Sequence, residues 1–164
     1  MTSKAHFTDA EWARLERAPI VAGMAISLAD PGGPIEAVKE STAAVRSVTE
    51  AAQADSGNEL VNAVAKSVVE KTQHRHNPLG DFKPRGRGAP EEILEELRAV
   101  NALLEEKATA DEAAAFREWL VATAKRSADA AKEGGFLGFN AQRVSEGEQH
   151  MLDTLGELFS SPAA

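Results

Sequence analysis

The sequence predicts an all-α protein, a compact single-domain bundle of six to seven helices with one long basic loop. Alanine, which has the highest intrinsic helix propensity, supplies 31 of the 164 residues. Runs of β-branched residues in strict alternation, which are typical of strands, are missing from the sequence. Apolar residues instead recur at three- and four-residue steps. We therefore expect one helical domain over residues 1–160, followed by a frayed tail at 161–164.

The first two helices are predicted from their boundaries. Thr8 and Glu11 have the spacing of a capping box, and Phe7 precedes them as a hydrophobic staple. Pro19 is expected to end this helix and to begin a second one over residues 19–30. This second helix is apolar nearly all round, which predicts a buried central position. Gly23 within it is unfavourable for helix formation, and a close crossing with another helix would explain its presence.

Five further helices follow along the chain. Pro34 begins the third after the turn DPGGP, and its expected apolar stripe is Ile35, Val38, Thr42, Val45 and Val48. Residues 54–58 end it, and the fourth runs to about residue 73. Residue 90 begins the fifth, with an apolar seam at Ile93, Leu97, Val100 and Leu104. The sixth and seventh begin at two more capping boxes, Thr109 with Glu112 and Ser145 with Glu148.

The charge is distributed unevenly along the chain. The net charge is −8 at pH 7, which argues against nucleic acid as a partner of the whole surface. Residues 73–90 nevertheless carry a net charge of +3, and the remainder carries −11. Residues 74–89 are rich in glycine and proline and poor in apolar residues, which predicts a long loop. Loops of this length are usually either functional or mobile.

Both ends of the sequence resemble one family of proteins. The opening has the pattern Phe-Thr-x-x-Glu-Trp followed by Ala-Asp-Pro-Gly, and the ending has Gly-Phe-Leu-Gly-Phe followed by Val-Ser-x-x-Glu. These motifs resemble a family of small, all-helical bacterial proteins with no assigned activity. The resemblance implies a helical fold and a bacterial origin, and it implies no catalytic or binding residue.

The glycine-rich turn near residue 136 is one candidate for partner binding. Phe136, Leu137 and Phe139 lie among glycines, close to Arg143. Large apolar side chains in such a turn either plug the end of the bundle or contact a partner or a lipid.

The basic stretch Lys83, Arg85 and Arg87 is the other candidate. Three interpretations stay open for it. It can lie against the acidic stretch 91–106 of its own chain, contact an acidic protein, or bind RNA or an anionic membrane.

The sequence gives little support for metal binding or catalysis. His74 and His76 are the candidate metal ligands, but the motif contains no third ligand, so we expect no metal site and no cofactor. Cysteine and tyrosine are missing, and neither a Gly-x-Ser-x-Gly elbow nor a phosphate-binding loop occurs. The carboxylates are expected on solvated helix faces, where nothing would shift their pKa values for acid–base work. No catalytic residue is therefore predicted.

These observations favour a non-enzymatic helical protein that acts through protein–protein contacts, as part of a larger assembly or as a homo-oligomer. The lack of cysteine and of a leader segment predicts a cytoplasmic location. The longest apolar helix is too short to span a bilayer, and neither a membrane nor nucleic acid is the favoured partner. The alternatives are a module that binds a small ligand or metal between residues 19–30 and the turn at 136–139, and a basic loop at 83–87 that contacts RNA or anionic lipid.

Overall fold

The computed structural model describes residues 2–29, 34–54, 58–132 and 144–160, and it confirms an all-helical fold for them. No strand occurs within these ranges. They form six α-helices and two short 3-10 helices, η1 (Lys4–His6) and η2 (Gly86–Gly88). The α-helices are α1 (Asp9–Ala29), α2 (Pro34–Gln53), α3 (Glu59–Gln73), α4 (Ala89–Lys107), α5 (Ala110–Lys132) and α6 (Glu146–Ser160).

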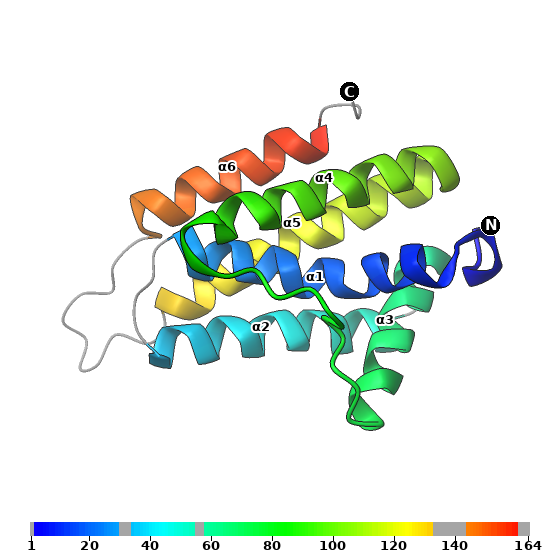
Figure 1. Cartoon of the computed structure of the whole chain (residues 1–164), viewed down its shortest axis with the longest axis horizontal. Helices are drawn as coiled ribbons and strands as arrows, with labels where there is room; N and C mark the ends of the chain where they lie inside the picture. The colour runs from blue at the N-terminus through cyan, green and yellow to red at the C-terminus, as the bar shows by residue number, and fades with distance from the viewer. Residues whose placement is uncertain (1, 30–33, 55–57, 133–143, 161–164) are drawn as a thin grey trace.

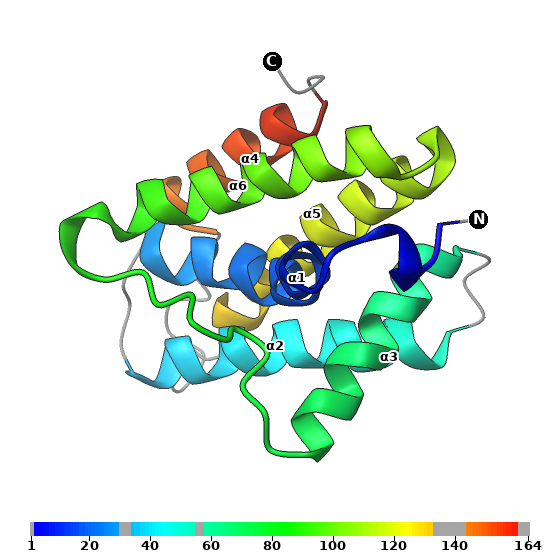
Figure 2. The same ribbon diagram turned by 45° about the vertical axis from the view of Figure 1, so that its right-hand side comes forward.

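Helix α1 lies at the centre of the bundle and contacts each of the other five helices (Figures 1 and 2). Figure 2 shows α4 and α6 on one side of α1 and α2 on the other. Helix α5 runs behind α1 and also contacts every other helix (Figure 1). The expectation that residues 19–30 belong to a buried central helix is thus confirmed up to Ala29.

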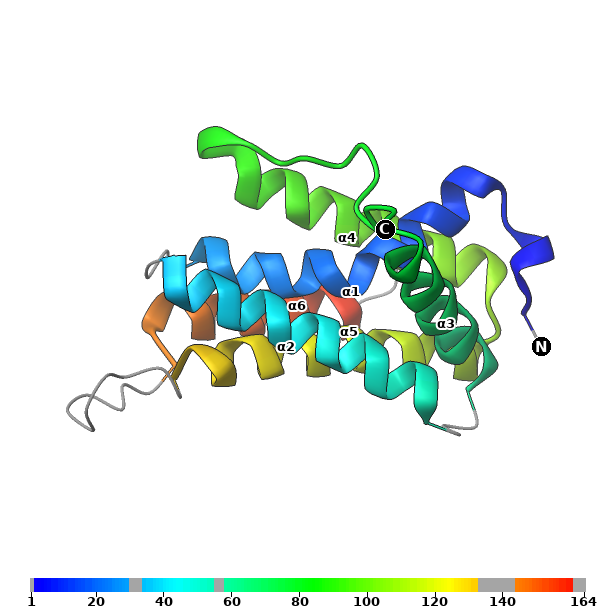
Figure 3. The same cartoon turned by 90° about the horizontal axis from the view of Figure 1, so that it is seen from below.

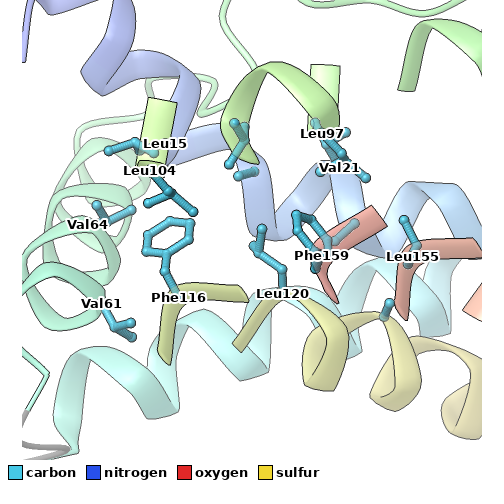
Figure 4. Close-up of a cluster of buried hydrophobic side chains, with 14 of the residues drawn as sticks. Leu15, Val21, Val61, Val64, Leu97, Leu104, Phe116, Leu120, Leu155 and Phe159 are labelled. Atoms are coloured by element: carbon cyan, nitrogen blue, oxygen red, sulfur yellow. The ribbon is translucent and has the colours of Figure 1, made fainter. Parts of the chain in front are cut away.

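The core is a single apolar cluster to which all six helices contribute (Figure 4). The seam expected on the fifth helix is confirmed in α4, because Ile93, Leu97, Val100 and Leu104 are all fully buried. Phe116 and Leu120 of α5 face this seam together with Leu155 of α6 (Figure 4). Each fully buried side chain of this size stabilises the fold by about 1.5–3 kcal/mol.

All three expected capping boxes are present. The backbone N–H of Thr8 donates to Glu11 Oε2 at 2.7 Å, and the N–H of Glu11 donates to Thr8 Oγ1 at 3.2 Å. The pairs Thr109 with Glu112 and Ser145 with Glu148 make the same reciprocal bonds. The expected staple is also formed, since the Phe7 ring lies 5.7 Å from that of Trp12. The N-termini of α1, α5 and α6 are therefore determined by residues within about four positions of where each helix begins.

The expected helix boundary at Pro19 is wrong, because α1 continues through this residue from Asp9 to Ala29. A proline inside a helix removes one backbone hydrogen bond and costs about 3 kcal/mol. Leu15 before it and Val21 after it are both fully buried against the surrounding helices. Apolar burial on both sides of Pro19 thus keeps the helix continuous, and the seven expected helices become six.

The expected close crossing at Gly23 is confirmed. A Cβ atom added to Gly23 would lie 2.9 Å from Ala44 Cβ of α2 and 3.1 Å from Ser127 Oγ of α5. Next to this point, the hydroxyls of Ser47 and Thr123 share a buried hydrogen bond of 2.7 Å between α2 and α5. Small side chains therefore let three helices approach one another closely.

The apolar stripe expected on the third helix is wrong at two of its positions. Val45 is 51% exposed and Thr42 is exposed, whereas Ala44, Ser47 and Val48 are buried. The side chains of Ile35 and Val38 lie outside the described part of the chain. The crossing at Gly23 has room only for small residues on α2, and this requirement rotates the larger Val45 away from the core.

Candidate functional site

The expected contact residues fall into two groups. Lys83, Arg85 and Arg87 are exposed in the connection between α3 and α4. Residues 136, 137, 139 and 143, the four expected at the other contact site, lie outside the described residues. We refer to residues 74–88 as the basic segment. It crosses α1 on the side that faces away from α5 (Figures 1 and 3).

The basic segment begins at the C-terminal end of α3, in a turn that usually contains glycine but here contains none. The N–H of His76 donates to the Lys71 carbonyl at 2.9 Å, and the N–H of Arg75 donates to the Thr72 carbonyl at 3.0 Å. These two bonds form a Schellman motif, whose left-handed position is usually glycine. Here that position is Arg75, with φ of 60°. A side chain in this conformation is strained by about 1–2 kcal/mol, and it adds an exposed positive charge at this end of the segment.

Short turns and two apolar side chains fix the middle of the basic segment. Asn77 accepts the N–H of Leu79 with its side chain and that of Gly80 with its carbonyl, each at 3.0 Å. The N–H of Phe82 donates to the Leu79 carbonyl at 3.1 Å. The side chains of Leu79 and Phe82 are half-buried and pack against the core. The segment is therefore attached to the bundle by its apolar residues, and its basic residues stay exposed.

A cluster of charged residues anchors the basic segment to α1 and α4. The Arg17 guanidinium carbon lies 5.6 Å from the centre of the Phe82 ring, a cation–π contact. Arg17 Nε also donates to Glu96 Oε1 of α4 at 2.7 Å, and Arg14 Nε donates to the same oxygen at 3.0 Å. Two guanidinium groups thus share one carboxylate, which leaves a net positive charge beside Phe82.

The sequence did not point to Arg14, Arg17 or Phe82 as parts of this site. A signal does exist in the sequence for the pairing of the two arginines with Glu96, though not for their contact with Phe82. Arg14 and Arg17 are three residues apart and so share a helix face. Glu96 lies next to the apolar seam of α4, and a carboxylate in that position needs a basic partner.

The interpretation in which the basic stretch lies against its own acidic helix is not supported. No ion pair joins Lys83, Arg85 or Arg87 to any acidic residue within the described ranges. On α4, Glu91 pairs instead with Arg98 at 3.0 Å. The three basic side chains therefore have no charged partner in the part of the chain that the structure describes.

The expectation that the carboxylates lie on solvated helix faces is wrong for four of them. Glu16 is fully buried, and Glu96, Glu112 and Glu148 are each at most 8% exposed. Glu112 and Glu148 complete capping boxes, and Glu96 binds the two arginines of α1. Burial raises the pKa of Glu112, but hydrogen bonds from Thr2 and Thr109 outweigh it and lower that pKa from 4.5 to about 2. These carboxylates stabilise helix ends and helix contacts.

Glu16 joins α1 to α3 through a buried polar cluster. The Ser67 hydroxyl donates to Glu16 Oε1 at 2.6 Å, and Lys71 forms an ion pair with Oε2. The indole N–H of Trp12 donates to the same Ser67 hydroxyl at 3.3 Å. Because both carboxylate oxygens accept protein donors, the cluster acts as a structural contact between the two helices.

The candidate metal ligands His74 and His76 lie in the turn that ends α3. His74 is the C-cap residue and His76 follows the left-handed Arg75, so the turn separates them and both are exposed. Among the described residues, no three His, Asp or Glu side chains gather in a way that could hold a metal ion. The proposed ligand pocket beside residues 136–139 lies partly outside the described ranges. Within those ranges, no helix has the length and apolar character needed to cross a bilayer.

Comparisons of this chain with models of known families, with curated proteins and with solved structures find no match. The resemblance to small bacterial helical proteins is therefore untested by them and stays a prediction.

Proposed function

We propose that this chain is a non-enzymatic, cytosolic helical protein that acts through protein–protein contacts, and that its basic segment binds an acidic surface of the partner. One observation carries the proposal. The basic segment is packed onto the bundle, yet Lys83, Arg85 and Arg87 are exposed and form no ion pair within the described residues.

The anchoring of the segment supports a binding role. Leu79, Phe82 and Arg17 attach it to the bundle, so its backbone is already ordered before a partner arrives. A preorganised surface loses less conformational entropy on association than a flexible arm does. Arg75 adds to this argument, because a strained backbone position that suits glycine holds a basic side chain instead.

The charge balance favours an acidic protein over nucleic acid or lipid. The chain outside residues 73–90 carries a net charge of −11, which would repel a phosphate backbone or an anionic membrane along most of the surface. An acidic patch on a protein can be as small as the segment itself. Such a contact fits a component of a larger assembly.

The proposal is tested by affinity capture with two charge-reversal variants. Arg85→Glu/Arg87→Glu reverses charges in the basic segment, and Lys66→Glu/Lys125→Glu reverses two exposed lysines on α3 and α5 as a matched control. Each variant and the unchanged chain are immobilised and exposed to a lysate of the source organism, with and without nuclease treatment. Capture is repeated at about 0.05 M and about 0.5 M salt, where screening differs strongly.

We expect the same proteins on the unchanged chain and the control, and their loss from Arg85→Glu/Arg87→Glu and at high salt. Equal capture by both variants would contradict the proposal. Capture that disappears with nuclease treatment would also contradict it and would assign the segment to nucleic acid.

A further inference from the structure

An exposed acidic patch lies beside the basic segment, at the beginning of α4. Glu92 and Glu95 are exposed on its first two turns, and neither forms an ion pair within the described chain. The basic segment leaves this end of α4 and crosses α1 toward the end of α3 (Figure 1). One region of the surface thus presents unpaired positive and negative groups next to each other.

We infer that the partner of the basic segment is a second copy of this chain, in a two-fold symmetric dimer. The inference rests on the proposed function and names its partner. In this dimer, Arg85 and Arg87 of each copy lie opposite Glu92 and Glu95 of the other.

Symmetry explains why adjacent patches of opposite charge favour this arrangement. A two-fold axis between the two patches places the basic patch of each copy on the acidic patch of the other, so every contact is made twice. Such an interface is closed, so assembly stops at the dimer. Within one chain the same groups stay unpaired, so they are available for pairing between copies.

The net charge of the chain determines the salt range in which the dimer forms. Two copies with a net charge of −8 repel each other over long distances at very low salt. At about 0.1 M salt, the screening length of about 10 Å weakens this repulsion more than it weakens ion pairs in contact. The dimer is therefore expected at about 0.1 M salt and is lost at about 1 M, where the screening length is about 3 Å.

Sedimentation velocity with three variants tests the inference. Arg85→Glu/Arg87→Glu makes both patches acidic, and Glu92→Lys/Glu95→Lys makes both patches basic. Each variant alone is expected to be a monomer at about 0.1 M salt, whereas an equal mixture of the two forms a heterodimer. The control Lys66→Glu/Lys125→Glu is expected to form dimers like the unchanged chain. Far-UV circular dichroism of each variant checks that its helices are intact.

A mixture that stays monomeric, while both variants keep their helices, would overturn the inference. A dimer of the unchanged chain that persists in Arg85→Glu/Arg87→Glu would overturn it as well. If the unchanged chain is a monomer at every salt concentration but still captures acidic proteins through Arg85 and Arg87, the inference fails and the proposed function stands. If the monomer also captures nothing, both fail.

Discussion

The two sides of α1 are built in different ways. Toward α2 and α5, the contact depends on small side chains, with Gly23 of α1 directly against Ala44 and Ser127. Toward α3, α4 and the basic segment, charged pairs are added to the buried apolar contacts, with Glu16 paired to Lys71 and Arg17 paired to Glu96.

Both sides stabilise the fold, and the charged side also carries the exposed side chains of the basic segment. The small-residue side is packed too closely to change without loss of stability. On the charged side, ion pairs supplement the apolar packing of α3 and α4, the Phe82 ring helps to attach the basic segment, and the basic side chains beyond it stay exposed. We therefore expect substitutions near Glu16 and Gly23 to change the free energy of unfolding, and substitutions in the basic segment to change binding.

The largest effect on stability is expected from Lys71→Met. The change removes the ion-pair partner of Glu16 and leaves a fully buried carboxylate with only the Ser67 hydroxyl. Loss of one partner of a buried pair costs about 3–5 kcal/mol, and the partial exposure of Lys71 places this case near about 3 kcal/mol. Urea denaturation measures it. The double variant Glu16→Met/Lys71→Met should recover most of the loss, and a double variant as unstable as the single one would contradict this account.

The next largest effect is a dependence of stability on pH through Glu112. Its pKa in the folded chain is about 2, against 4.5 as the ordinary value. A lowered pKa in the folded state means that the stabilisation is present above about pH 4.5 and disappears as the pH falls toward 2. At about 1.4 kcal/mol per pKa unit, the full contribution is at most about 3 kcal/mol. Glu112→Gln should therefore be less stable than the unchanged chain at pH 7, by an amount that shrinks between pH 4.5 and pH 2. A constant difference across this range would contradict the role given to Glu112.

Two glycine-to-alanine substitutions should change the free energy of unfolding in opposite directions. At Gly23 the new methyl group would lie 2.9 Å from Ala44 Cβ, so overpacking of about 1–3 kcal/mol outweighs the gain in helix propensity and stability falls by about 1 kcal/mol. At Gly156 in α6, nothing lies within 4 Å of the added Cβ, so the same change should stabilise the chain by about 0.5–1 kcal/mol. Thermal melts of the two variants compare them directly. Stabilisation by Gly23→Ala would show that the helices can move apart at this crossing.

Local features of the fold could be predicted from the sequence. The capping boxes at Thr8, Thr109 and Ser145 use partners three residues away, so a single stretch of sequence contains the whole interaction. The seam of α4 was predictable for the same reason, because its period is that of one helix.

Features that depend on distant partners could not be predicted from the sequence. Pro19 stays inside α1 because helices from later in the chain bury both of its flanks, and Val45 is exposed because Gly23 fixes the position of α2. Glu16 is buried because Ser67 and Lys71, more than 50 residues away, supply its donors. In the candidate site the exposed charges were predictable, but the anchor between Arg17 and Phe82 was not, since 65 positions separate the two residues.

The most direct test of this account measures stability and self-association together in Arg85→Ala/Arg87→Ala. Because both side chains are exposed and unpaired within the described residues, we expect the free energy of unfolding to change by less than about 0.5 kcal/mol. In the same preparation, sedimentation at about 0.1 M salt should show the dimer lost. If the variant unfolds, the basic segment has a structural role instead. If it stays as stable as the unchanged chain and keeps the dimer, the dimer does not form through the basic segment.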